Sequence, residues 1–328
     1  MKGSTQRDAN PFLYSDSNKR YHTYDYYLRR TFGGKCVKIP LDAGLTCPNI
    51  DGRCGTGGCI YCSGRGSGEQ AAPAHLSITE QYHTVRAQLS RKWAAERCIA
   101  YFQAHTNTYA PPERLRALWE EALSLPGVVG LNIATRADCL SDGVLAELAR
   151  VSERTVLTVE LGLQTVHDET ALKINRGHTF AQFLEGYARL RRSVPRARIG
   201  VHMILGLIGE NDEMMVESAQ KIAVLAPDEV KIHLLYVLEG TKMAEIYRNG
   251  SYFPMSREVY TDLVVRVLEC LPPETVIGRL TGDGAKDILL APDWSRDKRR
   301  ILNEIDKKIY ERNTWQGKQY LNFAHAHT

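Results

Sequence analysis

The 328-residue sequence contains no apolar run of the roughly 18 residues that a membrane-spanning helix needs. Its first residues, Met1 to Asp16, are polar and lack the apolar centre of a secretory signal peptide. Low-complexity tracts are absent, and a net charge of +4 is too small to identify a nucleic-acid partner by itself. We therefore expect a globular, cytoplasmic protein without membrane association.

Cysteine is not abundant either. Eight cysteines in a chain of this length exclude a disulfide-dense mini-protein, and a chain this long buries a core without crosslinks. Four of the eight, however, lie between Cys47 and Cys62. Because cytoplasmic thiols stay reduced, this cluster indicates metal binding or redox chemistry.

Short apolar segments alternate with amphipathic helical segments along most of the chain, which predicts a parallel sheet with right-handed crossovers. Helices are expected to begin near Thr79, Pro112, Ser141, Thr179, Asn211 and Arg257. Periodicity alone leaves a doubly wound sheet and a partial α/β barrel open, and both bind ligands at the carboxyl ends of the strands. The candidate strands are Cys36–Pro40, Ile99–Gln103, Gly130–Thr135, Val156–Leu161, Ile199–Leu205 and Val230–Tyr236.

We divide the chain into a basic aromatic segment (1–34), a core (35–271) and a C-terminal extension (272–328) with a charged helix over about Ser295 to Arg312. Residues 1–40 carry eight basic and three acidic side chains, and residues 285–328 carry nine and six. Such ends suit phosphate contacts and base stacking in RNA, although a solvated helix face is the alternative.

The most informative segment is Cys47-Pro-Asn-Ile-Asp-Gly-Arg-Cys54-Gly-Thr-Gly-Gly-Cys59-Ile-Tyr-Cys62, which directly follows the first expected strand. A four-cysteine zinc site and an iron–sulfur cluster are both compatible with its spacing. Its position favours the cluster, because a structural zinc site has no reason to lie at the ligand-binding end of a parallel sheet.

With Asp42-Ala-Gly-Leu-Thr before it, this segment resembles the radical S-adenosylmethionine (radical SAM) superfamily. The resemblance runs from about Tyr24 to Tyr320 and is strongest to the branch with oxygen-independent coproporphyrinogen oxidase, the elongator-type tRNA enzymes and the methylthiotransferases. In one small bacterial subfamily the first cluster cysteine is likewise far from the C-x-x-C pair.

The resemblance implies a partial (βα)6 TIM-type barrel in which Cys47, Cys59 and Cys62 hold a [4Fe–4S] cluster, leaving the fourth iron to SAM. Cys54 departs from this three-thiolate pattern. It is a bystander, a redox thiol, or an alternative first ligand that would give a more compact motif.

The resemblance also implies where SAM binds. Taken singly, Arg176 would be interpreted as a surface charge and Glu160 as a strand-end hydrogen-bond acceptor, but Gln164 and Arg176 together resemble a pair that contacts the SAM ribose and carboxylate. The implied SAM contacts are Tyr61, Gln103, Thr106, Asn107, Glu160, Gln164, Arg176 and Gly206.

In this superfamily an electron from the reduced cluster splits the SAM carbon–sulfur bond, and the resulting 5′-deoxyadenosyl radical takes a hydrogen atom from the substrate. The resemblance implies a reductant such as flavodoxin or ferredoxin. Because elongator-type and methylthiotransferase relatives act largely on tRNA, it also implies a tRNA substrate, modified at the wobble uridine side chain. The alternatives are a radical SAM enzyme for a small metabolite and a non-catalytic, zinc-bearing RNA-binding protein.

Overall fold

The computed structural model describes residues 10–320 apart from positions 67, 69, 92–95, 283 and 285. Its main sheet has seven strands in the order β1-β2-β3-β4-β5-β6-β8, and every neighbouring pair is parallel. The strands are β1 (Cys36–Leu41), β2 (Arg97–Phe102), β3 (Val128–Thr135), β4 (Val156–Gln164), β5 (Arg198–Leu205), β6 (Glu229–Leu234) and β8 (Val276–Arg279). The first six agree with the predicted strands to within a few residues.

Contacts between strands that are not neighbours show that the sheet curls. Lys38 on β1 places Nζ 3.3 Å from Glu160 Oε1 on β4 and 3.8 Å from Glu229 Oε1 on β6. Lys231 on β6 donates to the hydroxyl of Tyr101 on β2 at 3.2 Å. Such distant strands meet only around a shared interior, which confirms the predicted partial TIM-type barrel.

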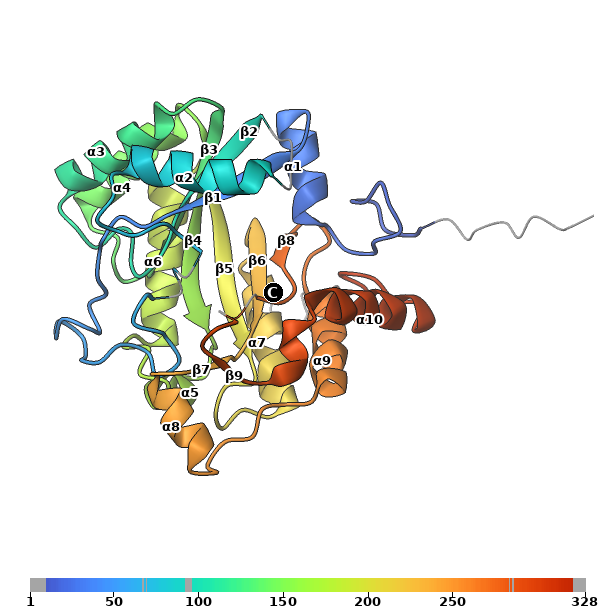
Figure 1. Cartoon of the computed structure of the whole chain (residues 1–328). Helices are drawn as coiled ribbons and strands as arrows, with labels where there is room; N and C mark the ends of the chain where they lie inside the picture. The colour runs from blue at the N-terminus through green and yellow to red at the C-terminus, as the bar shows by residue number, and fades with distance from the viewer. Residues whose placement is uncertain are drawn as a thin grey trace, which may run out of the picture.

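Helices cover the outer face of the sheet (Figure 1). Their apolar sides pack on the Val, Ile and Leu side chains that alternate outward along the strands, forming the main core. These helices are α2 (Ile78–Ser90), α3 (Pro112–Leu123), α4 (Asp142–Ser152), α6 (Phe180–Ser193), α7 (Asp212–Val224) and α9 (Arg257–Cys270).

The N-caps were partly predictable. Ser141, Thr179 and Asn211 each accept a backbone N–H in the first turn of their helices, as the sequence predicted. The first predicted cap was wrong, because Ser77 forms a capping box with Glu80 and α2 starts earlier than Thr79.

Several elements were not predicted. They are α1 (Tyr24–Phe32), α5 (Asp168–Lys173), α8 (Lys242–Arg248), the antiparallel pair β7 (Val237–Leu238) and β9 (Leu289–Ala291), and a 3-10 turn (Asp293–Arg296). The charged helix α10 (Lys298–Glu311) starts slightly later than expected. The elements α5, α8, β7 and β9 gather at the carboxyl end of the strands (Figure 1). The sheet also continues past residue 271, where the core was expected to end, because β8 pairs with β6.

The two expected flanking segments are joined to each other. The backbone carbonyl of Arg20 accepts the N–H of Gln316 at 3.0 Å, and His22 donates its N–H to Gln316 Oε1 at 2.9 Å. Lys19 forms an ion pair with Asp306 on α10. Tyr21 is buried, so it is not available for base stacking. Positions 1–9 and 321–328 of these segments lie outside the described residues.

In the described part of the chain, no helix has both the length and the apolar character needed to cross a bilayer.

Candidate active site

The cysteine loop, residues 46–66, lies at the carboxyl end of β1 and is tied by its backbone to three neighbouring segments. The N–H of Ile60 donates to the carbonyl of Ile174 at 3.1 Å, and the carbonyl of Ile60 accepts the N–H of Met243 at 2.9 Å. The N–H of Thr106, after β2, donates to Thr46 at 3.3 Å. The loop is therefore positioned from several sides without a helix or strand of its own.

Two asparagines add side-chain links. Asn49, which is 1% exposed, donates to Cys59 Sγ at 3.4 Å and to the carbonyl of Asn175 at 3.0 Å. Asn175 in turn donates to the carbonyls of Thr56 and Gly58 at 2.9 and 2.7 Å. Its φ of +54° is a conformation that asparagine adopts more readily than most residues. The sequence analysis missed both, although they lie next to Cys47 and Arg176.

Two of the three predicted cluster ligands, Cys59 and Cys47, occupy distinct environments. A hydrogen bond from Cys62, with further ones from Tyr61 and Asn49, lowers the pKa of the Cys59 thiol to about 6. Cys47 Sγ lies 3.0 Å from Thr106 Oγ1, while burial raises the pKa of the Cys47 thiol. The thiolate is the form that binds metal, so the lowered pKa of Cys59 is compatible with the predicted ligand role.

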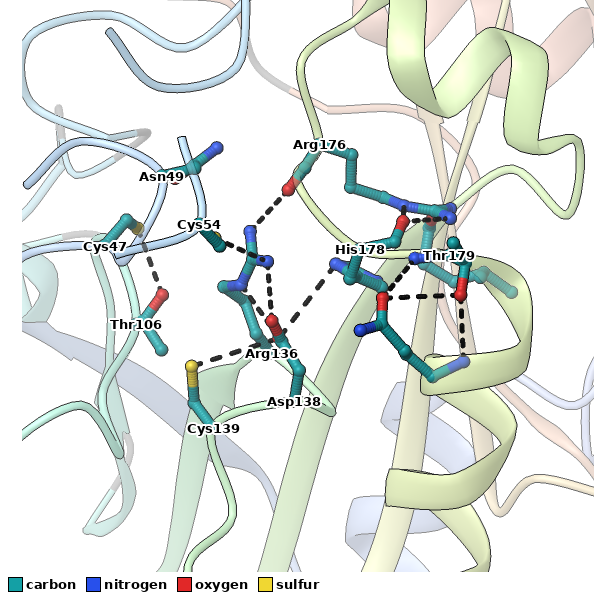
Figure 2. A network of polar contacts seen from close by, with 12 residues as sticks. Cys47, Asn49, Cys54, Thr106, Arg136, Asp138, Cys139, Arg176, His178 and Thr179 are labelled. Carbon is teal, nitrogen blue, oxygen red and sulfur yellow. Dashed lines mark hydrogen bonds and ion pairs between the residues drawn. The ribbon is translucent and has the colours of Figure 1, made fainter. Parts of the chain in front are cut away.

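Cys54 is oriented differently. Figure 2 shows Cys54 directed toward Arg136, whereas Cys47 is directed toward Thr106. Arg136 Nη2 donates to Cys54 Sγ at 3.6 Å and to Asp138 Oδ2 at 2.8 Å. Within the described ranges, no three His, Cys, Asp or Glu side chains converge to hold a single metal ion. Neither the four-cysteine set of a zinc site nor the three-cysteine set Cys47, Cys59 and Cys62 is therefore already drawn together as a metal site in the described loop.

The predicted SAM contacts after β2 lie beside Cys47. Asn107 is 1% exposed, and its Nδ2 donates to the carbonyls of Ala104 and Ala134 at 2.8 and 3.0 Å. Its Oδ1 is buried and has no hydrogen-bond partner among the residues that the structure describes. Gln103 is half-buried at the end of β2. Asn107 therefore offers a buried acceptor next to the residue, Thr106, that contacts a cluster cysteine.

Gln164 ends β4 and folds back over the sheet. Its φ is +64°, and its Nε2 lies 2.7 Å from where a Cβ on residue 162 would stand, so a larger residue at Gly162 would displace the Gln164 side chain. Gly206, with φ of +89°, donates its N–H to Met215 Sδ at 3.1 Å and accepts the Tyr252 hydroxyl at 2.8 Å. The side chain of Tyr61 is half-buried against a small apolar cluster at the mouth of the barrel, which is the open end formed by the carboxyl ends of the strands.

Arg176 is 1% exposed, and Figure 2 shows its side chain directed toward His178 and Thr179, away from Cys47 and Cys54. Its guanidinium donates at 2.5 Å to the carbonyls of both Leu163 and Thr165, twice to that of His178 at 3.0 and 2.8 Å, and to Asp168 at 3.5 Å. All five N–H groups are engaged. The predicted contact with the SAM carboxylate would require Arg176 to release at least one of these partners.

Glu160 lies inside the barrel and not at its mouth. It is fully buried, with Oε1 accepting from Lys38 at 3.3 Å and Asn132 at 2.8 Å, and Oε2 from Lys231 and His202. Each oxygen thus has two partners from the protein. Those partners come from β1, β3, β6 and β5, so Glu160 joins strands around the barrel interior.

Comparisons with known proteins agree with this geometry. Residues 49–222 match the Radical SAM superfamily and residues 227–311 its C-terminal domain. Uncharacterized protein YtqA of Bacillus subtilis is 46% identical over 309 residues, 94% of this chain and 95% of that protein. Protein YhcC of Escherichia coli is 33% identical over 285 residues, 87% and 90%.

More distant relatives belong to the elongator type. Human Elongator complex protein 3 is 27% identical over 163 residues, 49% of this chain and 29% of that protein. The solved structure of Elp3 from the archaeon Methanocaldococcus infernus aligns with a TM-score of 0.63 at 17% identity, covering 86% of this chain and 64% of that one. The structural match supports the fold alone.

Proposed function

Because this chain belongs to the Radical SAM superfamily, whose enzymes use a [4Fe–4S] cluster and S-adenosylmethionine, we propose that it modifies the wobble uridine side chain of tRNA. The observation that carries the proposal is the similarity to Elongator complex protein 3, because the resemblance to the elongator-type branch implies a tRNA substrate. The match covers part of each protein, so it supports the substrate class and no particular product.

The types of donor present, thiols within one loop and a buried amide oxygen beside it, fit the chemistry of the cluster and SAM. We assign Cys47, Cys59 and Cys62 as the cluster ligands, with Cys54 held aside by Arg136. When bound, cluster and SAM together supply a 5′-deoxyadenosyl radical. The unpartnered Oδ1 of Asn107 is suited to accept an N–H of SAM. The half-buried side chains of Tyr61, Gln103 and Gln164 complete the mouth.

We assign two other predicted SAM residues, Arg176 and Gly206, to shaping the backbone around SAM. Arg176 fixes the loop after β4 through four carbonyl contacts, and Gly206 provides the turn after β5. The protein's task is to orient these groups and exclude water, since the cofactors carry the difficult chemistry. Radical SAM enzymes need a reductant, and we propose flavodoxin or ferredoxin in the cytoplasm.

RNA contact is best supported on α10. Arg299 and Arg300 are exposed, and Tyr310 is 66% exposed with the Arg20 guanidinium 5.1 Å from its ring. Exposed cations and an exposed aromatic ring on one helix suit phosphate contacts and base stacking. Arg29, by contrast, is engaged by Asp16 and Asp25. We therefore assign RNA contact to the C-terminal flank more than to the N-terminal one.

The test is nucleoside mass spectrometry of tRNA from cells lacking the gene. We expect one wobble nucleoside to disappear and a precursor to accumulate. Re-expression of the wild type should restore the nucleoside, whereas Cys59→Ala, which lacks a cluster ligand, should not. An unchanged nucleoside profile would overturn the tRNA proposal and favour a small-metabolite substrate.

A further inference from the structure

The inner face of the sheet carries charged and imidazole side chains at matched heights. Parallel register places His202 on β5, Lys231 on β6 and Arg279 on β8 side by side. His233 lies two residues further along β6, toward the cysteine loop, and its ring centroid is 5.1 Å from that of His202. A group entering the barrel from the mouth would reach His233 before the other three.

The charges in this interior do not balance within the described residues. Glu160 is shared by Lys38 and Lys231, and Glu229 lies 3.8 Å from Lys38. Arg279 has neither an ion pair nor a hydrogen bond to any residue that the structure describes. Three basic side chains therefore face two carboxylates, and Arg279 is the one that contacts neither carboxylate. An uncompensated, partly buried charge is costly, so such a site favours an incoming anion.

Two further observations indicate that an anion would bind on the mouth side of this network. His233 Nε2 is buried without a hydrogen-bond partner among the described residues. Burial, together with the nearby charges of Lys38 and Arg279, lowers the pKa of Lys231 to about 7 despite its contact with Glu160. A negative group placed between these side chains would accept a hydrogen bond from His233 Nε2. It would also stabilise the positive charges of Lys231 and Arg279.

We propose that Arg279, Lys231 and His233 form a binding site for a carboxylate carried by the substrate. The planar fork of Arg279 matches the two carboxylate oxygens, while Lys231 and His233 supply single N–H donors. This proposal rests on the proposed function in placing the substrate within the barrel. It adds that the reacting side chain, a wobble uridine substituent in that function, is acidic. Glu160 is then a positioning residue that holds Lys231 and His202 in place.

The experiment compares two anticodon stem-loop RNAs that differ in one group. One carries 5-carboxymethyluridine at the wobble position and the other carries 5-carbamoylmethyluridine, its neutral isostere. Binding to the cluster-loaded, SAM-bound protein is measured without oxygen. We expect the wild type to bind the acid about tenfold more tightly than the amide, as hydrogen bonds between charged groups imply.

Substitutions then assign the preference to this site. In Arg279→Gln the acid-to-amide ratio should fall to near one, and Arg279→Lys should restore part of it. The matched control is Arg300→Gln, which removes an exposed cation on α10 and should weaken both RNAs equally. Arg279→Gln should still hold the cluster and should still cleave SAM slowly in the absence of substrate. If it fails either check, Lys231→Met is tested in its place and should show the same fall in the acid-to-amide ratio.

A second probe pair separates this proposal from the tRNA proposal. Uracil-5-acetic acid and its amide are titrated into the same protein by calorimetry. If the free acid is preferred in an Arg279-dependent way but neither RNA binds, the carboxylate site stands and the tRNA proposal falls. If the RNAs bind without an acid preference, or Arg279→Gln weakens both alike as for a backbone phosphate, the carboxylate site is overturned. Lack of preference in both probe pairs also overturns it.

Discussion

The cysteine loop and the barrel interior are held in place by different kinds of contact within one half-barrel. The loop is fixed mainly by neutral groups, namely backbone amides and the side chains of Asn49 and Asn175. The interior is fixed by full charges on strands, with Glu160 at its centre. A net hydrogen bond between neutral groups contributes about 0.5–1.5 kcal/mol, whereas an orphaned buried charge costs about 3–5 kcal/mol. The loop should therefore tolerate single losses that the interior does not.

The largest effect is expected from the ligands themselves. Cys47→Ala should abolish cluster assembly, because three thiolates are needed, while Cys54→Ala should retain about four irons per chain. Iron analysis and the visible absorption of anaerobically reconstituted protein measure both. The reverse result would show that Cys54, rather than Cys47, is the first ligand.

Loss of a central charge should follow. Glu160→Gln removes the carboxylate shared by Lys38 and Lys231, and we expect about 3–5 kcal/mol of destabilisation. Anaerobic denaturant unfolding of the cluster-loaded protein measures it. Glu304→Gln breaks a more exposed pair with Arg257 and should cost under about 1 kcal/mol. Equal effects from the two variants would contradict the contrast between interior and surface charge.

A smaller effect is expected in the loop. Asn49→Ala leaves the carbonyl of Asn175 and the sulfur of Cys59 without this donor, at a cost of about 1–3 kcal/mol. The cluster should still assemble but be lost several-fold faster to a chelator, as followed by absorbance. Asn303→Ala, on the exposed face of α10, is the matched control and should leave the rate unchanged. Failure of Asn49→Ala to assemble a cluster would show that the loop is less tolerant than its neutral contacts indicate.

The smallest effect concerns His178, which is buried beside Asp138 and Arg176. Burial, with the charges of Arg176 and Arg136, lowers its pKa from 6.5 to about 3. As pH falls below 6.5, the unfolded chain binds a proton that the folded chain does not, so stability falls toward pH 3. His178→Gln should flatten the decrease in melting temperature between about pH 7.5 and 5.5. The same slope as the wild type would contradict this, and His75→Gln, at an exposed position, should keep that slope.

The sequence predicted the strands and the cysteine motif because both depend on local order: apolar runs bounded by turns, and thiols at set intervals. It did not predict the depth of Glu160 or the direction of Arg176. Register around a curled sheet determines the first, and the carbonyls of the loop after β4 determine the second. Asn49 and Asn175 were missed for a related reason, since they contact each other across 126 residues of sequence.

The joined flanks have a consequence for the outer edge of the sheet. The carbonyl of His22 accepts the N–H of Ile277 on β8 at 2.7 Å, and Arg20 donates to Asn313, 293 residues later, at 3.0 Å. Residues 20–22 thus reach their final places only together with residues that lie far later in the chain. Until the flanks are joined, the outer edge of β8 stays open to pairing with other chains. Folding intermediates with separated flanks are consequently the ones most prone to misassociation.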